Sequence, residues 1–124
     1  MVKLYPDDSY TLHTDAYQIN MMQTYWRQGL ADRKAIFELY LRKVPFRNGY
    51  AIFAGLARVV DYIQNLRFTE HDLAYLKEIG DYPDDFIEYL RNFKFKATIR
   101  SVVDGEVVFN NEPLIQVEGP LVDC

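Results

Sequence analysis

The segment LHTDAYQINMMQTYW, residues 12–26, has the pattern of a helix that is apolar on two sides. Its apolar side chains fall into two neighbouring stripes at helical spacing, a first stripe of Tyr17, Met21 and Tyr25 and a second stripe of Ile19, Met22 and Trp26. A surface helix needs only one such stripe to pack against the core of its domain. Two stripes therefore predict that this helix is buried against two different partners.

The start of this helix is marked by polar residues. Asp15 is a preferred N-cap residue type, and Gln18 follows three residues later at the spacing of a capping box. The sequence thus predicts a helix that begins at Asp15 and a reciprocal pair of cap hydrogen bonds between Asp15 and Gln18.

The bulk composition restricts the class of protein. The chain has 124 residues, 49% of them hydrophobic, which excludes a disordered chain and suits one domain. A net charge of −4 predicts no general affinity for nucleic acid or acidic membranes. The only cysteine is Cys124, the start of the chain does not resemble a signal peptide, and no apolar run approaches the ~20 residues of a membrane span. We expect a soluble, cytoplasmic protein without a nucleic-acid or membrane partner.

The middle of the chain predicts one strand and three helices. Residues 35–43 alternate with two largely apolar faces, which predicts a strand covered on both sides, and residues 44–50 predict a loop. Residues 51–66 predict a buried helix, in which close packing against another backbone would explain Gly55. Two short helices follow. The first is marked by a capping box of Thr69 and Asp72 and by Gly80 at its end, and the second by Pro83 and a buried stripe of Phe86, Tyr89, Leu90 and Phe93.

From Ala97 onward the apolar pattern has a period of two. Three extended runs are separated by Asp104-Gly105, a strong hairpin signal, and by Asn110-Asn111. The whole order is α-β-α-α-α-β-β-β, which predicts an α+β fold with a terminal meander. Because the chain stops soon after Gly119-Pro120, where a further element would begin, we expect it to be the front part of a longer protein.

No standard catalytic motif is complete in the sequence, so we expect no catalytic residue and no metal ligand within it. We expect surface or capping roles for the two histidines, and helix-start roles for three carboxylates; these residues are His13, His71, Asp81, Asp84 and Asp85. Two basic groups flank strands and could hold phosphate or form an ordinary solvated cluster; they are Arg42, Lys43 and Arg47, and Lys94, Lys96 and Arg100. Tyr17 could pack in the core or lay its ring against a planar ligand at the positive end of the helix.

Several of these segments resemble the N-terminal part of the nicotinate phosphoribosyltransferase family. They are TDAYQINMMQTYWRQG, AIFELYLRKVPFRNGYAIFAGLARVVDYIQNLRF and VEGPL, in this order from about Leu12 to the end of the chain. The sequence departs from the family at PFRNGY, where the family more often has a run of glycines.

The resemblance implies a fold and an activity. It implies that residues 1–124 form an N-terminal α/β domain with a hammerhead-like strand arrangement, typical of type II phosphoribosyltransferases and here truncated before the barrel. The full-length enzyme would make nicotinate mononucleotide and diphosphate from nicotinate and phosphoribosyl diphosphate in NAD salvage, driven by ATP hydrolysis through a phosphorylated histidine. The histidine and the Mg²⁺ and ATP sites would lie in the barrel, so the 124-residue chain alone would be inactive.

The resemblance also implies roles for three residues. Tyr17 matches a tyrosine that stacks on the pyridine ring of the substrate from the partner subunit of a homodimer with shared active sites. Arg42 and Lys43 match a basic pair that contacts the phosphates of the donor. Two alternatives stay open, a stand-alone binding or interaction module derived from this domain, and a fragment of a nicotinamide or quinolinate phosphoribosyltransferase.

Overall fold

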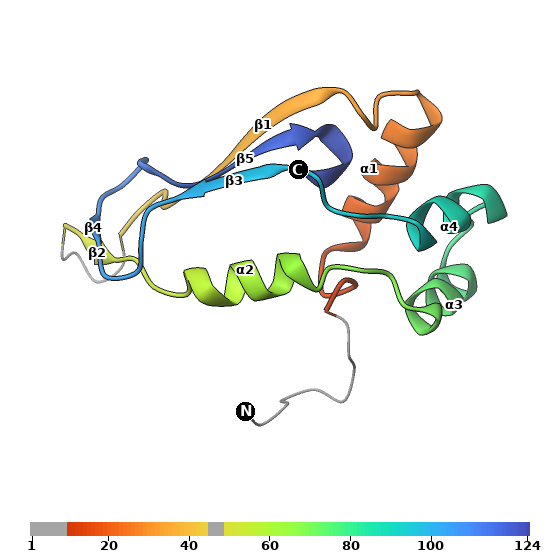
Figure 1. The fold of residues 1–124 in the computed structure, drawn as a ribbon, viewed down its shortest axis with the longest axis horizontal. Helices are drawn as coiled ribbons and strands as arrows, with labels where there is room; N and C mark the ends of the chain where they lie inside the picture. Colours follow the sequence, from red (N-terminus) through yellow and green to blue (C-terminus); the bar gives the residue numbers. More distant parts are fainter. Residues whose placement is uncertain (1–9, 45–48) are drawn as a thin grey trace.

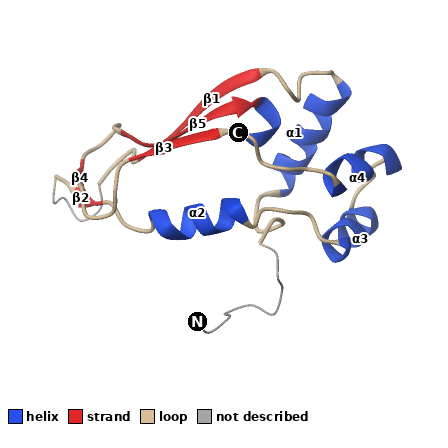
Figure 2. Ribbon diagram, in the orientation of Figure 1, coloured by secondary structure: helices blue, strands red, loops and turns tan. Residues whose placement is uncertain are grey.

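The computed structural model describes residues 10–44 and 49–124, which form a mixed α+β domain (Figures 1 and 2). The elements follow in the order α1 (Ala16–Arg27), β1 (Lys34–Tyr40), β2 (Ala51–Ile52), α2 (Leu56–Gln64), α3 (Glu70–Ile79), α4 (Asp84–Arg91), β3 (Thr98–Ser101), β4 (Val107–Val108), β5 (Pro113–Pro120) and the 3₁₀ turn η2 (Leu121–Asp123). The predicted fold class is confirmed, and the element boundaries are confirmed in part.

A three-stranded sheet with the order β1-β5-β3 forms the centre of the domain. Both β1 and β3 run antiparallel to β5, so these two outer strands run in the same direction. In Figure 1, α2 lies beneath this sheet, α1, α3 and α4 gather at one end, and the small β2–β4 ribbon lies at the other. The end of β1 and the start of β3 therefore lie at opposite ends of the sheet.

The buried core lies where α1, α3 and α4 meet. Phe86 and Leu90 of α4 are fully buried, and Leu73 and Ile87 are 1% and 2% exposed. The predicted stripe of α4 is confirmed for Phe86 and Leu90, while Tyr89 and Phe93 are half-buried against the same cluster. Ile87 belongs to the core although the sequence analysis did not include it.

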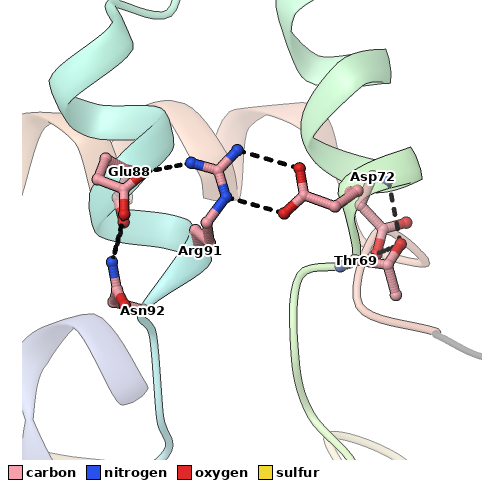
Figure 3. A network of polar contacts seen from close by, with 6 residues as sticks. Thr69, Asp72, Glu88, Arg91 and Asn92 are labelled. Carbon is pink, nitrogen blue, oxygen red and sulfur yellow. Dashed lines mark hydrogen bonds and ion pairs between the residues drawn. The ribbon is translucent and has the colours of Figure 1, made fainter.

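Local polar contacts fix α3 and α4. The predicted capping box of α3 is confirmed, since the Asp72 amide donates to Thr69 Oγ1 at 3.2 Å and the Thr69 amide donates to Asp72 Oδ2 at 2.8 Å. The Arg91 guanidinium of α4 donates to both carboxylate oxygens of Glu70 in α3, at 2.8 and 3.1 Å, and also binds Glu88 (Figure 3). These contacts tie the two short helices together.

The predicted helix over residues 51–66 is wrong in its first part. Residues 51 and 52 form β2, which pairs with β4, and α2 begins only at Leu56. Gly55 takes φ = 109°, a left-handed conformation that favours glycine, and among the described residues, its own chain neighbours aside, no atom lies within 4 Å of the place where a Cβ would stand. Its role is thus to turn the chain into the helix, and the described part of the structure does not contain the expected close backbone contact. The helix is also not buried, since Val60 is 40% exposed.

The hairpin predicted at Asp104-Gly105 is wrong in its pairing. A turn does form there, with Gly105 at φ = 97°, but β3 pairs with β5 and β4 pairs with β2. The turn instead binds the segment before α2: the Gly105 amide donates to the Phe53 carbonyl at 2.8 Å, and the Phe53 amide donates to the Glu106 carbonyl at 2.9 Å. The Asp104 carboxylate accepts the Leu56 amide at 3.0 Å and caps α2 from a distant part of the chain.

The expectation that the first strand is covered on both sides is also wrong for the part of the chain that the structure describes. Ile36, Phe37 and Leu39 of β1 are 55%, 46% and 57% exposed. The physical reason is that α2 lies beneath only part of the sheet and nothing among the described residues covers its other face (Figure 2).

The VEGPL segment makes a close backbone contact through Gly119 with Ala97, the residue before β3. A Cβ on Gly119 would stand 2.6 Å from the Cα of Ala97, so only glycine fits where β5 passes the entry to β3. The Asp123 carboxylate accepts the amides of Lys96 and Ala97 at 2.5 and 2.9 Å, which holds this entry in place.

The cap of α2 gives a testable prediction. Replacing Asp104 with Ala removes the acceptor of the Leu56 amide, and loss of such a cap lowers the free energy of unfolding by about 1 kcal/mol. Asp104→Asn keeps a side-chain oxygen that can accept the Leu56 amide, so its free energy of unfolding should fall clearly less. Urea denaturation of the three proteins tests this, and equal stabilities of the Ala variant and the unaltered protein would contradict the cap.

Candidate functional site

Tyr17 lies in the first turn of α1 and points away from the core. Its side chain is 56% exposed, and its hydroxyl accepts a hydrogen bond from Gln18 Nε2 at 3.0 Å. A tyrosine packed in the core would be mostly buried, so the structure places the ring where a ligand or another chain can reach it. Whether it contacts a substrate stays a prediction.

The start of α1 differs from the predicted capping box. Asp15 is the N-cap residue, as expected, but its side chain makes no cap hydrogen bond, and Gln18 is bonded to Tyr17. The first turn contains no acidic residue. The amides of a helix start carry partial positive charge, and the carboxylate of Asp15 is the negative charge that stands at this end of α1.

The two apolar stripes of α1 have different surroundings. The second stripe packs on the domain's own core: Ile19 is 4% exposed, and Met22 and Trp26 pack against the cluster of α3 and α4. The Trp26 ring centroid lies 5.5 Å from that of Phe86. The first stripe is not covered among the described residues, since Met21 is 38% exposed and lies with Tyr25 at the wall of a cavity.

That cavity, of about 420 Å³, lies between α1, α2, the sheet and the turn η2. Its walls are mainly apolar, with Phe37 and Val117 from the sheet and Val59 and Ile63 from α2. Burial raises the pKa of the Tyr62 hydroxyl beside it. Tyr17 does not belong to its walls, so the cavity and the exposed ring are separate features.

Arg42 and Lys43 follow β1 and are both exposed. The residues on either side of them are held by the turn between β4 and β5: the Val44 amide donates to Asn110 Oδ1 at 2.6 Å, and the Asn111 amide donates to the Leu41 carbonyl at 2.8 Å. Neither basic side chain takes part in the ion pairs found among the described residues.

The other basic residues do not join this pair. Arg100 lies in β3 and donates to Glu118 at 2.7 Å, and Lys34 of β1 binds the same carboxylate. Lys94 and Lys96 precede β3 and so lie at the end of the sheet opposite Arg42, as the parallel directions of β1 and β3 require. Arg47 lies outside the described residues. The two basic groups are therefore separate.

Of the other polar candidates, Asp85 accepts the Phe86 amide at 2.9 Å and Asp84 pairs with Lys77, which lowers the pKa of Asp84. Their expected helix-start role is confirmed. His13 and His71 are exposed.

Among residues 10–44 and 49–124, no group of three or more His, Cys, Asp or Glu side chains could hold a metal ion. Of the helices described, none has the length and apolar content needed to cross a bilayer.

Sequence reasoning missed Gln18 as the partner of Tyr17 and Asn110 as a partner of the loop after β1. The Asn110-Asn111 pair was identified as a turn, which gave its position but not its contact. That contact joins residues 66 positions apart, and no local pattern indicates it.

Comparison with known proteins identifies a family for this chain. Residues 12–124 match the family model described as the nicotinate phosphoribosyltransferase (NAPRTase) N-terminal domain. The chain is 55% identical over 97% of its length to nicotinate phosphoribosyltransferase of Bacillus subtilis and 37% identical over 90% to that of Homo sapiens. The crystal structure of human nicotinic acid phosphoribosyltransferase matches with a TM-score of 0.79 over 88% of this chain. The chain covers 24% of the Bacillus protein, 21% of the human one and 22% of the chain in the human crystal structure, so it spans about a quarter of their length or less.

The pairing of Glu118 gives a testable prediction. The Lys34 ammonium, and after it the Arg100 guanidinium, hold the pKa of Glu118 below its usual value of 4.5. Because this pKa is depressed in the folded state, the stabilisation from Glu118 is complete above about pH 4.5 and is lost as the pH falls through the folded-state pKa.

An NMR titration of the Glu118 carboxyl group measures this directly. Lys34→Met should move the pKa back toward 4.5, and by more than Arg100→Met does. Lys77→Met serves as the control, because it removes an ammonium that is paired with Asp84 in the helical part of the domain. This substitution should leave the pKa of Glu118 unchanged. A pKa of Glu118 near 4.5 in the unaltered protein would contradict its pairing with Lys34 and Arg100.

Proposed function

Because the chain belongs to the nicotinate phosphoribosyltransferase N-terminal domain family, we propose that it is part of an enzyme that makes nicotinate mononucleotide and diphosphate from nicotinate and phosphoribosyl diphosphate. The observation that carries this proposal is the 55% identity, over 97% of the chain, to a protein of that name. The exposed ring of Tyr17 supports it from the structure. Substrates and activity belong to the whole enzyme, of which this domain supplies one portion.

Tyr17 is proposed to stack its ring on the pyridine ring of nicotinate. A phenol ring that is 56% exposed, and whose hydroxyl accepts a hydrogen bond from Gln18, offers a flat apolar face for such stacking. Nicotinate also carries a carboxylate, but Asp15 at the N-cap places a carboxylate of its own at the start of α1. The proposed contact is therefore the stacking of the ring, and the helix start gives no argument for an acid over a neutral amide as the acceptor.

Arg42 and Lys43 are proposed to contact the phosphate groups of the donor. Both side chains are exposed, and no carboxylate among the described residues pairs with them in the structure. Arginine can grip a phosphate with two parallel hydrogen bonds, and lysine adds a compact positive charge.

ATP hydrolysis is proposed to drive the reaction forward, which would give the enzyme ligase character. The described residues do not fit a metal site, because they contain no suitable group of three ligands. From the family resemblance, we propose that the Mg²⁺ and ATP sites lie in the barrel domain of the full-length enzyme. When bound, Mg²⁺ would neutralise phosphate charge on the donor.

The enzyme is proposed to be a cytoplasmic homodimer with shared active sites. The first stripe of α1 supports this, because Tyr17 and Met21 are exposed although they belong to an apolar face of the helix. Apolar side chains gathered on an exposed face are typical of an interface. Tyr17 on one subunit would then complete the pocket of its partner.

The stacking role predicts a graded effect of substitutions at Tyr17 in the full-length enzyme. Ring stacking contributes about 0.5–1.5 kcal/mol beyond area burial, so Tyr17→Ala should weaken nicotinate binding by about two- to tenfold or more. Tyr17→Phe keeps the ring and should cost much less. Equilibrium binding of nicotinate measures both effects.

The stability of the same variants is the control. Because Tyr17 is 56% exposed, its truncation should leave the free energy of unfolding nearly unchanged, whereas truncation of a buried aromatic residue costs about 3–5 kcal/mol. A large loss of stability with normal nicotinate affinity would assign Tyr17 to packing and reject the stacking role.

A shared site predicts that a weakened and an inactive variant gain activity when mixed, at nicotinate concentrations well below the KM of the weakened one. The weakened variant carries Tyr17→Ala, and the inactive one lacks the catalytic histidine of the barrel. A mixed dimer should regain about one working pocket, which a product assay after subunit exchange detects. Exchanged dimers that gain no activity would show that each pocket is built from a single chain.

A further inference from the structure

The four residues 41–44 after β1 are held at both ends by one turn. The Leu41 carbonyl accepts the Asn111 amide at 2.8 Å, and the Val44 amide donates to the side-chain oxygen of Asn110 at 2.6 Å. The two residues between these bonds are Arg42 and Lys43. The basic pair therefore sits on a short stretch of backbone that is fixed on either side.

The turn that holds this stretch is itself well fixed. Asn111 takes φ = 61°, a left-handed conformation that asparagine tolerates, and the Glu112 carboxylate accepts the Phe109 amide at 2.9 Å. Val108, which precedes the turn, is 3% exposed, and Val44 is 5% exposed. Buried side chains thus anchor both sides of the contact, and Asn110 Oδ1 is the side-chain atom that joins them.

The basic side chains carried by this stretch differ from the other strand cations. Lys34 and Arg100 are both bound to Glu118, whereas neither Arg42 nor Lys43 takes part in the ion pairs found among the described residues. Both are exposed. Two adjacent cations on a fixed backbone, without a carboxylate partner there, are suited to an anion with several oxygens, such as a diphosphate.

We propose that Asn110 is a positioning residue that holds Arg42 and Lys43 in the geometry that binds the diphosphate group of the donor. This inference rests on the proposed function, because it extends the phosphate-binding role of that pair. Long basic side chains lose conformational freedom when they bind a ligand. A backbone held in advance by Asn110 lowers that cost, which raises the affinity for the anion.

The first test is the kinetics of Asn110→Ala in the full-length enzyme. The KM for phosphoribosyl diphosphate should rise by about three- to tenfold, while kcat and the KM for nicotinate stay within about twofold. Asn92→Ala is the matched control, because the Asn92 side chain is likewise bonded to backbone, with Nδ2 donating to the Glu88 carbonyl at 2.9 Å, but lies in the helical part of the domain. An unchanged donor KM in Asn110→Ala overturns the inference.

Two further readouts separate positioning from a general loss of structure. In Asn110→Ala, the Val44 amide should exchange its hydrogen faster, while the Asp72 amide of the α3 capping box should not. Adding Asn110→Ala to the double variant Arg42→Ala/Lys43→Ala should raise the donor KM no further, since Asn110 acts through that pair. Additive effects, or an unchanged donor KM in the double variant alone, would overturn the inference.

A binding measurement makes failure of this inference distinguishable from failure of the proposed function. Calorimetry with inorganic diphosphate requires no catalysis. If the enzyme lacks transferase activity but Asn110→Ala and the double variant each weaken diphosphate binding by about threefold or more, the positioning role stands and the proposed reaction is wrong. If diphosphate binds the unaltered protein and Asn110→Ala equally, or binds neither, the positioning role is wrong.

Discussion

The packing of α1 on α3 and α4 is the contact on which the arrangement of this domain depends. Ile19, Met22 and Trp26 form the face of α1 that meets the buried cluster around Phe86 and Leu90. Trp26 lies 5.5 Å from Phe86 and 5.9 Å from Tyr89, measured between ring centroids. Full burial of one such side chain contributes roughly 1.5–3 kcal/mol, so this contact outweighs the exposed ion pairs between the helices. Once this face is committed to the core, the rotation of α1 about its axis is fixed and Tyr17 must face outward.

The features of the fold that depend on neighbouring residues could be predicted in part from the sequence, although the capping box expected for Asp15 and Gln18 does not form. The capping box of Thr69 and Asp72 involves residues three positions apart, and the structure contains both of its hydrogen bonds. The features that depend on distant residues could not. The segment before Leu56 has a helical apolar spacing, yet hydrogen bonds between Phe53 and the turn around Gly105 place it in a strand, and the left-handed Gly55 separates that strand from α2. Asp104-Gly105 has the sequence of a hairpin turn, but the strands on either side of it do not pair with each other. Instead, β3 pairs with β5 and β4 pairs with β2.

The candidate site shows the same division. The two stripes of α1 predicted that the helix packs against two different partners, but the sequence left open whether Tyr17 lies in the core. The 56% exposure of Tyr17 comes from the structure. The six basic residues near strand ends could not be grouped without the strand directions, because the end of β1 and the start of β3 lie at opposite ends of the sheet. The bond from Asn110 to the loop that carries Arg42 and Lys43 crosses 66 residues and arises from tertiary structure only. Sequence patterns indicate which side chains are available, and the topology decides which of them can act together.

The central claim is that the outward ring of Tyr17 is a contact for the pyridine substrate. A crystal structure of the full-length enzyme with nicotinate bound tests it most directly. The ring of Tyr17 should lie against the pyridine ring in an offset or tilted arrangement, with the two centroids about 4.5–7 Å apart. A Tyr17 ring packed against protein side chains alone, with nicotinate held elsewhere, would contradict it.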